Sequence, residues 1–239
     1  RDGFVTLPAF STTQNANGHR KFDVRMGNLE NLHVRVKRLG GDALLYALKG
    51  YSEEYEGWGE SRTVAFGMVP GREVYEKRIP RKAEIDTTET VNLSWDELSG
   101  GETYGGYYFC AEGESDTPSG QGVGAQALIQ LTDIGLAWKQ TEKETLIYAF
   151  SLETGTPLSA VDIILYNDQV DSLTKKQTDA GGLVKFTADE YKGKAAWLDA
   201  RAGKDRHVMR FSEDLETVGL WSFSIDYRYD APLQDERRT

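Results

Sequence analysis

The stretch TDIGLAWKQTEKETLIYAFSLETGTPLSAVDIILYN (residues 132–167), followed by TDAGGLVKF (residues 178–186), decides the fold class of this chain. Large apolar residues recur at every second position within it: Ile134, Leu136 and Trp138, then Leu146, Tyr148 and Phe150, then Val161, Ile163 and Leu165. Such an alternation places the apolar side chains on one face of an extended strand. The stretch therefore predicts consecutive strands with one buried face, and it carries no catalytic motif.

Turn residues separate these strands. Gly155 can adopt a positive φ without steric cost, and Pro157 fixes the backbone where the next strand begins. Asp179 can accept a local backbone hydrogen bond, while Gly181 or Gly182 supplies a left-handed residue. Such signals recur roughly every 8–12 residues through the second half, a spacing typical of an immunoglobulin-like sandwich.

The first half of the chain shows the same alternation. Leu32, Val34 and Val36 alternate with polar or charged neighbours, and an aromatic segment at residues 107–110 follows a Gly-Gly turn. No amphipathic helix is expected, apart from a single helical turn after Trp95. Further candidate strands occupy residues 21–25, 43–48, 62–68, 73–78 and 91–95.

The segment EGESDTPSGQGVG (residues 112–124) has the composition of a linker and predicts a domain boundary. The expected fold class is all-β, with two tandem immunoglobulin-like sandwiches and a partly irregular C-terminal extension. The expected organisation is a connecting segment at residues 1–19, sandwiches at residues 20–120 and 126–212, and a connection toward a following domain at residues 213–239.

Charge and composition narrow the function classes. The net charge is −10, from 28 basic and 38 acidic residues, so a nucleic-acid partner is not expected. Basic residues gather only beside Pro80, where a solvated loop is the simpler interpretation: Lys77, Arg78, Arg81 and Lys82. No apolar run is long enough for membrane insertion. Because the sequence begins with Arg1 and shows no signal sequence, an internal piece of a longer chain is expected.

Few residues offer catalytic or metal chemistry. The three histidines, His19, His33 and His207, are far apart in the sequence, and a structural or solvent-exposed role is expected for each. Carboxylates at residues 53–56 and 168–171 could serve a glycosidase, although solubilising charge is the simpler interpretation. Neither catalytic, cofactor-binding nor metal-ligating residues are therefore predicted.

Two further motifs could indicate a ligand-binding site, but each also has a simpler structural interpretation. The glycines of GQGVG (residues 120–124) do not have the spacing of a dinucleotide-binding turn, which favours a linker. Trp58 with Tyr51 and Tyr55 could form a carbohydrate-stacking surface, or could pack the end of a sandwich.

Three motifs of the second half resemble a macroglobulin domain of the bacterial alpha-2-macroglobulins. They are the opening Thr132-Asp133-Ile134-Gly135, the turn Gly155-Thr156-Pro157 and the turn Thr178-Asp179-Ala180-Gly181. The first half is similar to a preceding macroglobulin domain, through LHVRVKRL and GGYYFCAEG. The resemblance covers about residues 20 to 225.

The resemblance implies a periplasmic protease inhibitor, anchored to the membrane as a lipoprotein, that traps proteases after they cleave a bait segment. Some members of the family carry a thioester in a Cys-x-Glu-Gln motif. Here Cys110-Ala111-Glu112-Gly113 has glycine at the position of the glutamine, so no thioester is expected and Cys110 is interpreted as a buried packing residue.

We therefore expect a structural segment of a protease trap, without bait or thioester and without enzymatic activity. Its expected partners are proteases, for the full-length protein, and neighbouring macroglobulin domains of the same chain. No cofactor is expected. The alternative is a binding module, in which tandem sandwiches belong to a surface adhesin or a carbohydrate-binding protein.

Overall fold

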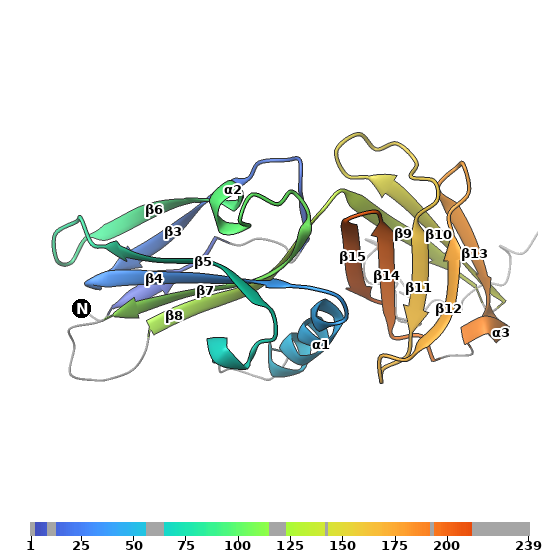
Figure 1. Ribbon diagram of the computed structural model, residues 1–239, viewed down its shortest axis with the longest axis horizontal. Coiled ribbons are helices and arrows are strands. Elements are labelled where there is room, and N and C mark those ends of the chain that lie inside the picture. The colour runs from blue at the N-terminus through green and yellow to red at the C-terminus, as the bar shows by residue number, and fades with distance from the viewer. Residues whose placement is uncertain are drawn as a thin grey trace, which may run out of the picture.

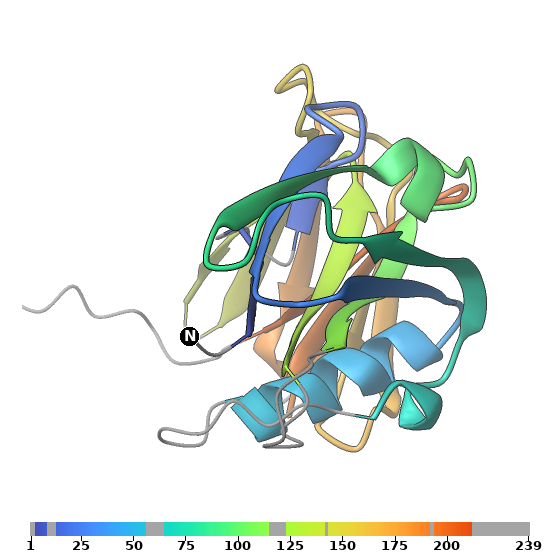
Figure 2. The ribbon, with the colours of Figure 1, turned by 90° about the vertical axis from the view of Figure 1, so that its left-hand side faces the viewer.

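The computed structural model describes residues 3–8, 13–55, 65–114, 123–141, 143–191 and 194–211. These residues form two β-sandwiches that follow each other along the long axis of the molecule (Figures 1 and 2). The predicted all-β class and its two tandem sandwiches are confirmed. None of the helices in the described part of the chain is long and apolar enough to cross a membrane.

The first sandwich consists of a five-stranded and a three-stranded sheet. The five-stranded sheet has the order β2 (Thr13–Asn15), β8 (Val123–Thr132), β7 (Gly105–Glu114), β4 (Asn31–Leu39) and β5 (Arg72–Pro80). The three-stranded sheet has the order β1 (Phe4–Thr6), β3 (Lys21–Gly27) and β6 (Thr88–Ser94). The β2–β8 pair is parallel, and the other pairs are antiparallel.

The core of the first sandwich follows the alternation of its strands. Leu32, Val34 and Val36 of β4 are fully buried and face the three-stranded sheet. Trp95 begins the short helix α2 (Trp95–Leu98), the single helical turn expected there, and its ring lies 5.4 Å from that of Tyr107. Its indole N–H donates to Gln14 of β2, which attaches the N-terminal strand to this core.

The second sandwich consists of a three-stranded and a four-stranded sheet. The three-stranded sheet has the order β13 (Leu183–Thr187), β10 (Glu144–Ser151) and β9 (Ile134–Gln140). The four-stranded sheet has the order β12 (Ser172–Gln177), β11 (Asp162–Tyr166), β14 (Trp197–Ala202) and β15 (Asp205–Arg210). The short helix α3 (Ala188–Tyr191) follows β13.

The turns of the second sandwich have the predicted chemistry. Gly155 has a φ of +72°, and Gly182, rather than Gly181, is the left-handed residue of the later turn, with a φ of +75°. The carboxylate of Asp179 accepts hydrogen bonds from the backbone N–H groups of Gly181 and Leu183 at 2.8 and 2.9 Å. A Cβ at residue 182 would lie 2.5 Å from the carbonyl oxygen of Ala149, so only glycine fits this position.

The expected domain boundary at residues 112–124 is not where the sheets divide. The described ends of this segment pair with each other, Glu112 with Gly124 and Gly113 with Val123, so they belong to the β7–β8 hairpin. A Gly- and Ser-rich segment serves a hairpin as well as a linker, which is why its composition misled. We propose a boundary at Asp133, the single residue between β8 and β9. Residues 115–122 lie outside the described part.

The expected connecting segment at residues 1–19 also contributes strands. β1 pairs with β3 and β2 pairs with β8, so both belong to the first sandwich. Three-residue strands carry too little alternation to be recognised in a sequence. The expected connection at residues 213–239 lies outside the described residues.

The segment at residues 43–48 is a helix and not the expected strand. It begins α1 (Ala43–Tyr55), where Leu44, Leu45 and Leu48 are buried together. A short apolar run cannot be assigned to a strand or a helix by periodicity alone. The expected strand at residues 62–68 ends in a 3₁₀ turn, η1 (Phe66–Met68), and residues 62–64 are outside the described part. The strands expected at residues 21–25, 73–78, 91–95 and 107–110 lie in or overlap β3, β5, β6 and β7.

Candidate functional site: the junction between the sandwiches

An apolar cluster joins the two sandwiches, and we call it the junction core. Its buried residues come from the first sandwich (Leu39, Leu44, Leu45, Leu48, Phe66, Val69, Tyr108, Cys110 and Leu128) and from the second (Ile164, Tyr166, Trp197 and Val208). Figure 1 shows α1 at the junction of the two sandwiches. The cluster is therefore a third core, which belongs to neither sandwich alone.

The junction core arises because several strands have two buried faces. In β11, Ile163 and Leu165 face the core of the second sandwich, while Ile164 and Tyr166 face the junction. In β14, Leu198 faces the core of the second sandwich, and its neighbour Trp197 faces the junction core. A strand buried on both faces has a continuous apolar run in place of an alternation.

Helix α1 links the first sandwich to the second. Its leucines fill the junction core, and Lys49 donates to the backbone carbonyl of Asp168, in the loop after β11. Just before the helix, Arg206 of β15 donates to the carbonyl oxygen of Gly41. The middle of α1 and the residues before it are therefore attached to the second sandwich by charged donors.

A buried carboxylate organises these contacts. Asp199 of β14 has no exposed surface, and its carboxylate accepts from Nε and Nη2 of Arg206 at 2.8 and 2.6 Å. It also accepts from Nε and Nη2 of Arg201 at 2.9 and 2.6 Å. The hydrogen bond to Asp199 raises the pKa of Arg201. Two arginines satisfy the buried carboxylate and are held toward the start of α1, where Arg201 approaches Asp42 to 3.9 Å.

A glutamine of β8 pairs with β15 across the junction. The side-chain amide of Gln130 donates to the carbonyl oxygen of Val208 at 2.7 Å, and its oxygen accepts from the Val208 N–H at 2.8 Å. Gln130 is 1% exposed. Without Gln130, the N–H and C=O groups of Val208 would be buried without hydrogen-bond partners. The Gln130 amide bonds to both groups, as the backbone of a neighbouring strand would.

His207 of β15 makes a second polar contact between the sandwiches. Its Nδ1 donates to the carbonyl oxygen of Ile134 at 2.8 Å, so Nε2 accepts from the hydroxyl of Thr13 in β2 at 3.1 Å. Burial lowers the pKa of His207. The neutral imidazole fits this arrangement, which confirms the expected structural role of His207 within a strand.

The link between the sandwiches is itself fixed. The backbone N–H of Asp133 donates to the carboxylate of Asp205 at 2.8 Å, and the Asp133 carboxylate accepts from the N–H of Glu153 at 2.9 Å. Burial raises the pKa of Asp205. A one-residue link with both its amide and its carboxylate bonded leaves little freedom for the two sandwiches to rotate.

The remaining candidate residues do not converge on a site. His19 is exposed, and His33 donates to Glu76 at 2.8 Å, a hydrogen bond that lowers the pKa of Glu76. Asp168 pairs with Lys49 across the junction, and Asp171 accepts from Asn167 at 3.0 Å, so each of these carboxylates has a structural partner. Within the described residues, no group of three His, Cys, Asp or Glu side chains could hold a metal ion. Trp58 and residues 120–122 lie outside the described part, as do the side chains of residues 51–55 and Glu56.

Cys110 lies in the junction core, as its interpretation as a packing residue requires. It is fully buried in β7, and burial raises the pKa of its thiol to about 12. Its sulfur accepts a long hydrogen bond from the side-chain amide of Gln126, at 3.8 Å. A thiol with this pKa is protonated near neutral pH and is a poor nucleophile.

Sequence reasoning missed the junction core, although two signals were present. The run Asp162–Tyr166 contains four consecutive apolar residues, and residues 107–111 contain five. Continuous runs of this kind indicate burial on both faces. What no run shows is which surfaces meet, because α1 and the second sandwich are far from β7 in the sequence.

The comparisons with known proteins agree with this architecture. The family model of the bacterial alpha-2-macroglobulin MG3 domain matches residues 131–230. Within residues 131–230, the chain therefore carries a domain of the bacterial alpha-2-macroglobulin family. The matched range begins at the end of β8, close to the boundary at Asp133. No curated protein matches the sequence.

Solved structures of bacterial alpha-2-macroglobulins have a similar fold. A native Escherichia coli structure spanning domains NIE-MG1 has a TM-score of 0.65 and 19% identity, with 87% of this chain and 96% of that chain covered. One spanning MG0-NIE-MG1 has a TM-score of 0.64 and 20% identity over 88% of this chain and 64% of that one. A Salmonella alpha-2-macroglobulin mutant has a TM-score of 0.59 and 21% identity over 95% of this chain. This chain spans only 13% of that Salmonella chain.

Proposed function

We propose that this chain is a structural segment of a bacterial alpha-2-macroglobulin that traps proteases. In this proposal the two sandwiches are tandem macroglobulin domains that act as scaffold, without bait, thioester or enzymatic activity. The full-length protein would be a periplasmic lipoprotein whose partners are proteases and the neighbouring macroglobulin domains. The similar Escherichia coli protein has been solved in a trypsin-activated form, which supports proteases as partners.

The observation that carries the proposal is the junction core. A binding module needs an exposed site, whereas here the best-organised residues outside the two sandwich cores are buried between the sandwiches. Apolar packing, the carboxylate of Asp199 and the Gln130 amide bind one sandwich to the other. These contacts suit a segment that holds neighbouring domains in place rather than one that binds a ligand on an exposed surface.

The experiment compares protease trapping by the full-length protein with and without an intact junction. Leu45→Ala creates a cavity in the junction core and Tyr46→Ala, on the exposed side of the same helix, is the control. We expect Leu45→Ala to reduce the fraction of trypsin retained after cleavage, with Tyr46→Ala unchanged. Full retention by Leu45→Ala, in a protein shown by spectroscopy to have a loosened junction, would argue against a scaffold role.

A further inference from the structure

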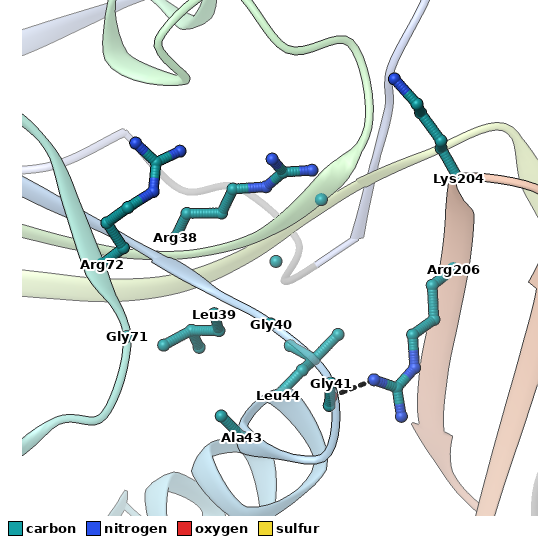
Figure 3. A pocket seen from close by; sticks show the side chains of 12 residues that line it. Arg38, Leu39, Gly40, Gly41, Ala43, Leu44, Gly71, Arg72, Lys204 and Arg206 are labelled. Atoms are coloured by element: carbon teal, nitrogen blue, oxygen red, sulfur yellow. Dashed lines mark hydrogen bonds between the residues drawn. The ribbon is translucent and has the colours of Figure 1, made fainter.

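A basic pocket of about 580 Å³ opens where the two sandwiches meet at the start of α1. Figure 3 shows Arg38 and Arg72 on the side of the first sandwich, and Lys204 and Arg206 on the side of the β14–β15 turn. Gly40 and Gly41 form part of the wall between them. We call these residues the junction pocket. Leu39, Leu44 and Arg206 line the pocket and also belong to the junction contacts, whereas Arg38, Arg72 and Lys204 have no part in them.

The positive charge of the junction pocket is only partly neutralised. Arg206 is paired with Asp199, and Arg38 lies 3.1 Å from Glu102. Arg72 and Lys204 are exposed, and the side chain of neither has an ion pair or hydrogen bond within the described residues. Two cations without partners face one pocket in a chain whose net charge is −10.

The strand pairing indicates that this charge is specific to the pocket. Along the β4–β5 ladder, Arg35 is opposite Glu76 and Lys37 is opposite Glu73, so opposite charges meet. Arg38, however, is directly opposite Arg72. Like charges in directly opposed positions destabilise a sheet, and an anion bound beside both arginines would offset this repulsion. Figure 3 shows both guanidinium groups on the same side of these strands.

The wall of the pocket allows a close approach. No atom lies within 4 Å of the position that a Cβ would take at Gly40 or Gly41, so these glycines face open space. Because glycine has no side chain, a bound molecule can approach the backbone closely at these positions. Ala43, the first residue of α1, also lines the pocket, and the N-terminus of a 13-residue helix adds partial positive charge.

We propose that the junction pocket binds an acidic polypeptide segment with two or more closely spaced Asp or Glu side chains. Arginine binds carboxylates through paired hydrogen bonds, and the cations lie on opposite sides of the pocket. A single inorganic oxyanion has the volume of a few waters, roughly 100 Å³ or less, and would fill little of this space. The net charge of −10 repels a long polyanion such as a nucleic acid more strongly than a short segment with a few carboxylates.

The pocket lies between the two sandwiches, so a bound segment should affect how firmly they are joined. Arg72 belongs to the first sandwich and Lys204 to the second, so one bound segment would contact both. A ligand that binds only the joined arrangement stabilises it by mass action. Binding should therefore raise the midpoint of thermal unfolding, and should need both sandwiches.

Fluorescence anisotropy with a labelled hexaglutamate peptide tests the proposal at low ionic strength. We expect Arg72→Glu and Lys204→Glu each to weaken binding by roughly tenfold, which corresponds to about 1.4 kcal/mol. The double variant Lys21→Glu, Lys139→Glu carries the same change of charge as Arg72→Glu and Lys204→Glu combined in one protein, but at exposed positions on β3 and β9. We expect this control to retain most of the affinity.

A variant that blocks the pocket distinguishes binding within the pocket from attraction to the overall charge of the protein. Gly40→Glu places a carboxylate where the wall is open, at a residue without a positive φ, and we expect it to abolish peptide binding with the fold intact. Equal binding by the pocket variants and the control would overturn the proposal. Tighter binding of sulfate, phosphate or a single-stranded oligonucleotide than of the peptide would overturn it as well. Absence of peptide binding by the wild type would also overturn the proposal, but would leave the scaffold role unaffected, because that role rests on the junction core.

Discussion

At the scale of single residues, Asp199 is the residue on which the polar side of the junction depends. Its buried carboxylate accepts from two arginines, one of which reaches the carbonyl oxygen before α1. The positive charges of Arg201 and Arg206 compensate a carboxylate that would otherwise be costly to bury.

We expect Asp199→Asn to lower the free energy of unfolding by about 3 kcal/mol, because it leaves two cations without their counterion. Asp162→Asn is the matched control, since Asp162 pairs with Lys175 at 2.9 Å at the surface. That exposed pair should contribute less than about 1 kcal/mol. Urea unfolding of both variants measures the difference, and equal losses would show that Asp199 does not organise the junction.

His207 should make stability depend on pH. Its pKa is lowered in the folded protein, so the unfolded chain takes up a proton first as the pH falls. The contribution of His207 to the free energy of unfolding is present above its pKa in the unfolded chain, about 6.5. This contribution is lost as the pH falls below that value toward the pKa of His207 in the folded protein. Asp205, whose pKa is raised, has the opposite sign at acid pH.

Comparison with His207→Asn isolates this effect, because Asp205 is present in both proteins and an Asn amide can still donate to Ile134. Between pH 7.5 and 5.5, we expect the wild type to lose more unfolding free energy than the variant. Urea titrations at both pH values measure this loss. Parallel losses would contradict the lowered pKa of His207.

Cys110 should be unreactive in the folded protein. Its thiol is buried and its pKa is raised to about 12, so neither access nor thiolate is available. We expect iodoacetamide to leave the native protein unmodified by mass spectrometry and to modify it fully in urea. Modification of the native protein within minutes would show that the junction core opens readily.

At the scale of elements, the sequence predicted the strands better than it predicted their partners. Alternation identified β4 and β9, because each has one more deeply buried face. It located β10 as well but assigned the wrong face, since Ile147 and Ala149 are buried whereas Leu146 is 39% exposed. It failed at α1, whose LLYAL begins as a short apolar run, and at β7–β8, whose hairpin tip has linker composition. Local patterns record burial, but the surface that provides the burial comes from distant residues.

Helix α1 provides the prediction at this scale. Leu45 is fully buried in the junction core, whereas Tyr46 is 56% exposed on the same helix. Leu45→Ala should cost about 2–5 kcal/mol of unfolding free energy through lost burial and a residual cavity. Tyr46→Ala should change it by about 0.5 kcal/mol or less. If calorimetry shows the same melting temperature for the two variants, α1 does not pack as described.

At the scale of the whole molecule, the two sandwiches are held as one body by three features. The junction core supplies apolar contact, Asp199 and Gln130 supply satisfied polar contacts, and Asp133 supplies a short, bonded link. The sequence predicted two sandwiches and their family, but it could not show that they share a core. The sequence also gave no sign of the junction pocket, because its cations come from three separate segments.

The central claim is that the junction fixes the two sandwiches relative to each other. Double electron–electron resonance tests it most directly, with spin labels at the exposed positions Lys21→Cys and Lys139→Cys and with the buried Cys110 left in place. We expect one narrow distance distribution in the otherwise wild-type protein, and a broader one when Leu45→Ala is added. A distribution in the wild-type background as broad as that of the Leu45→Ala protein would contradict the claim.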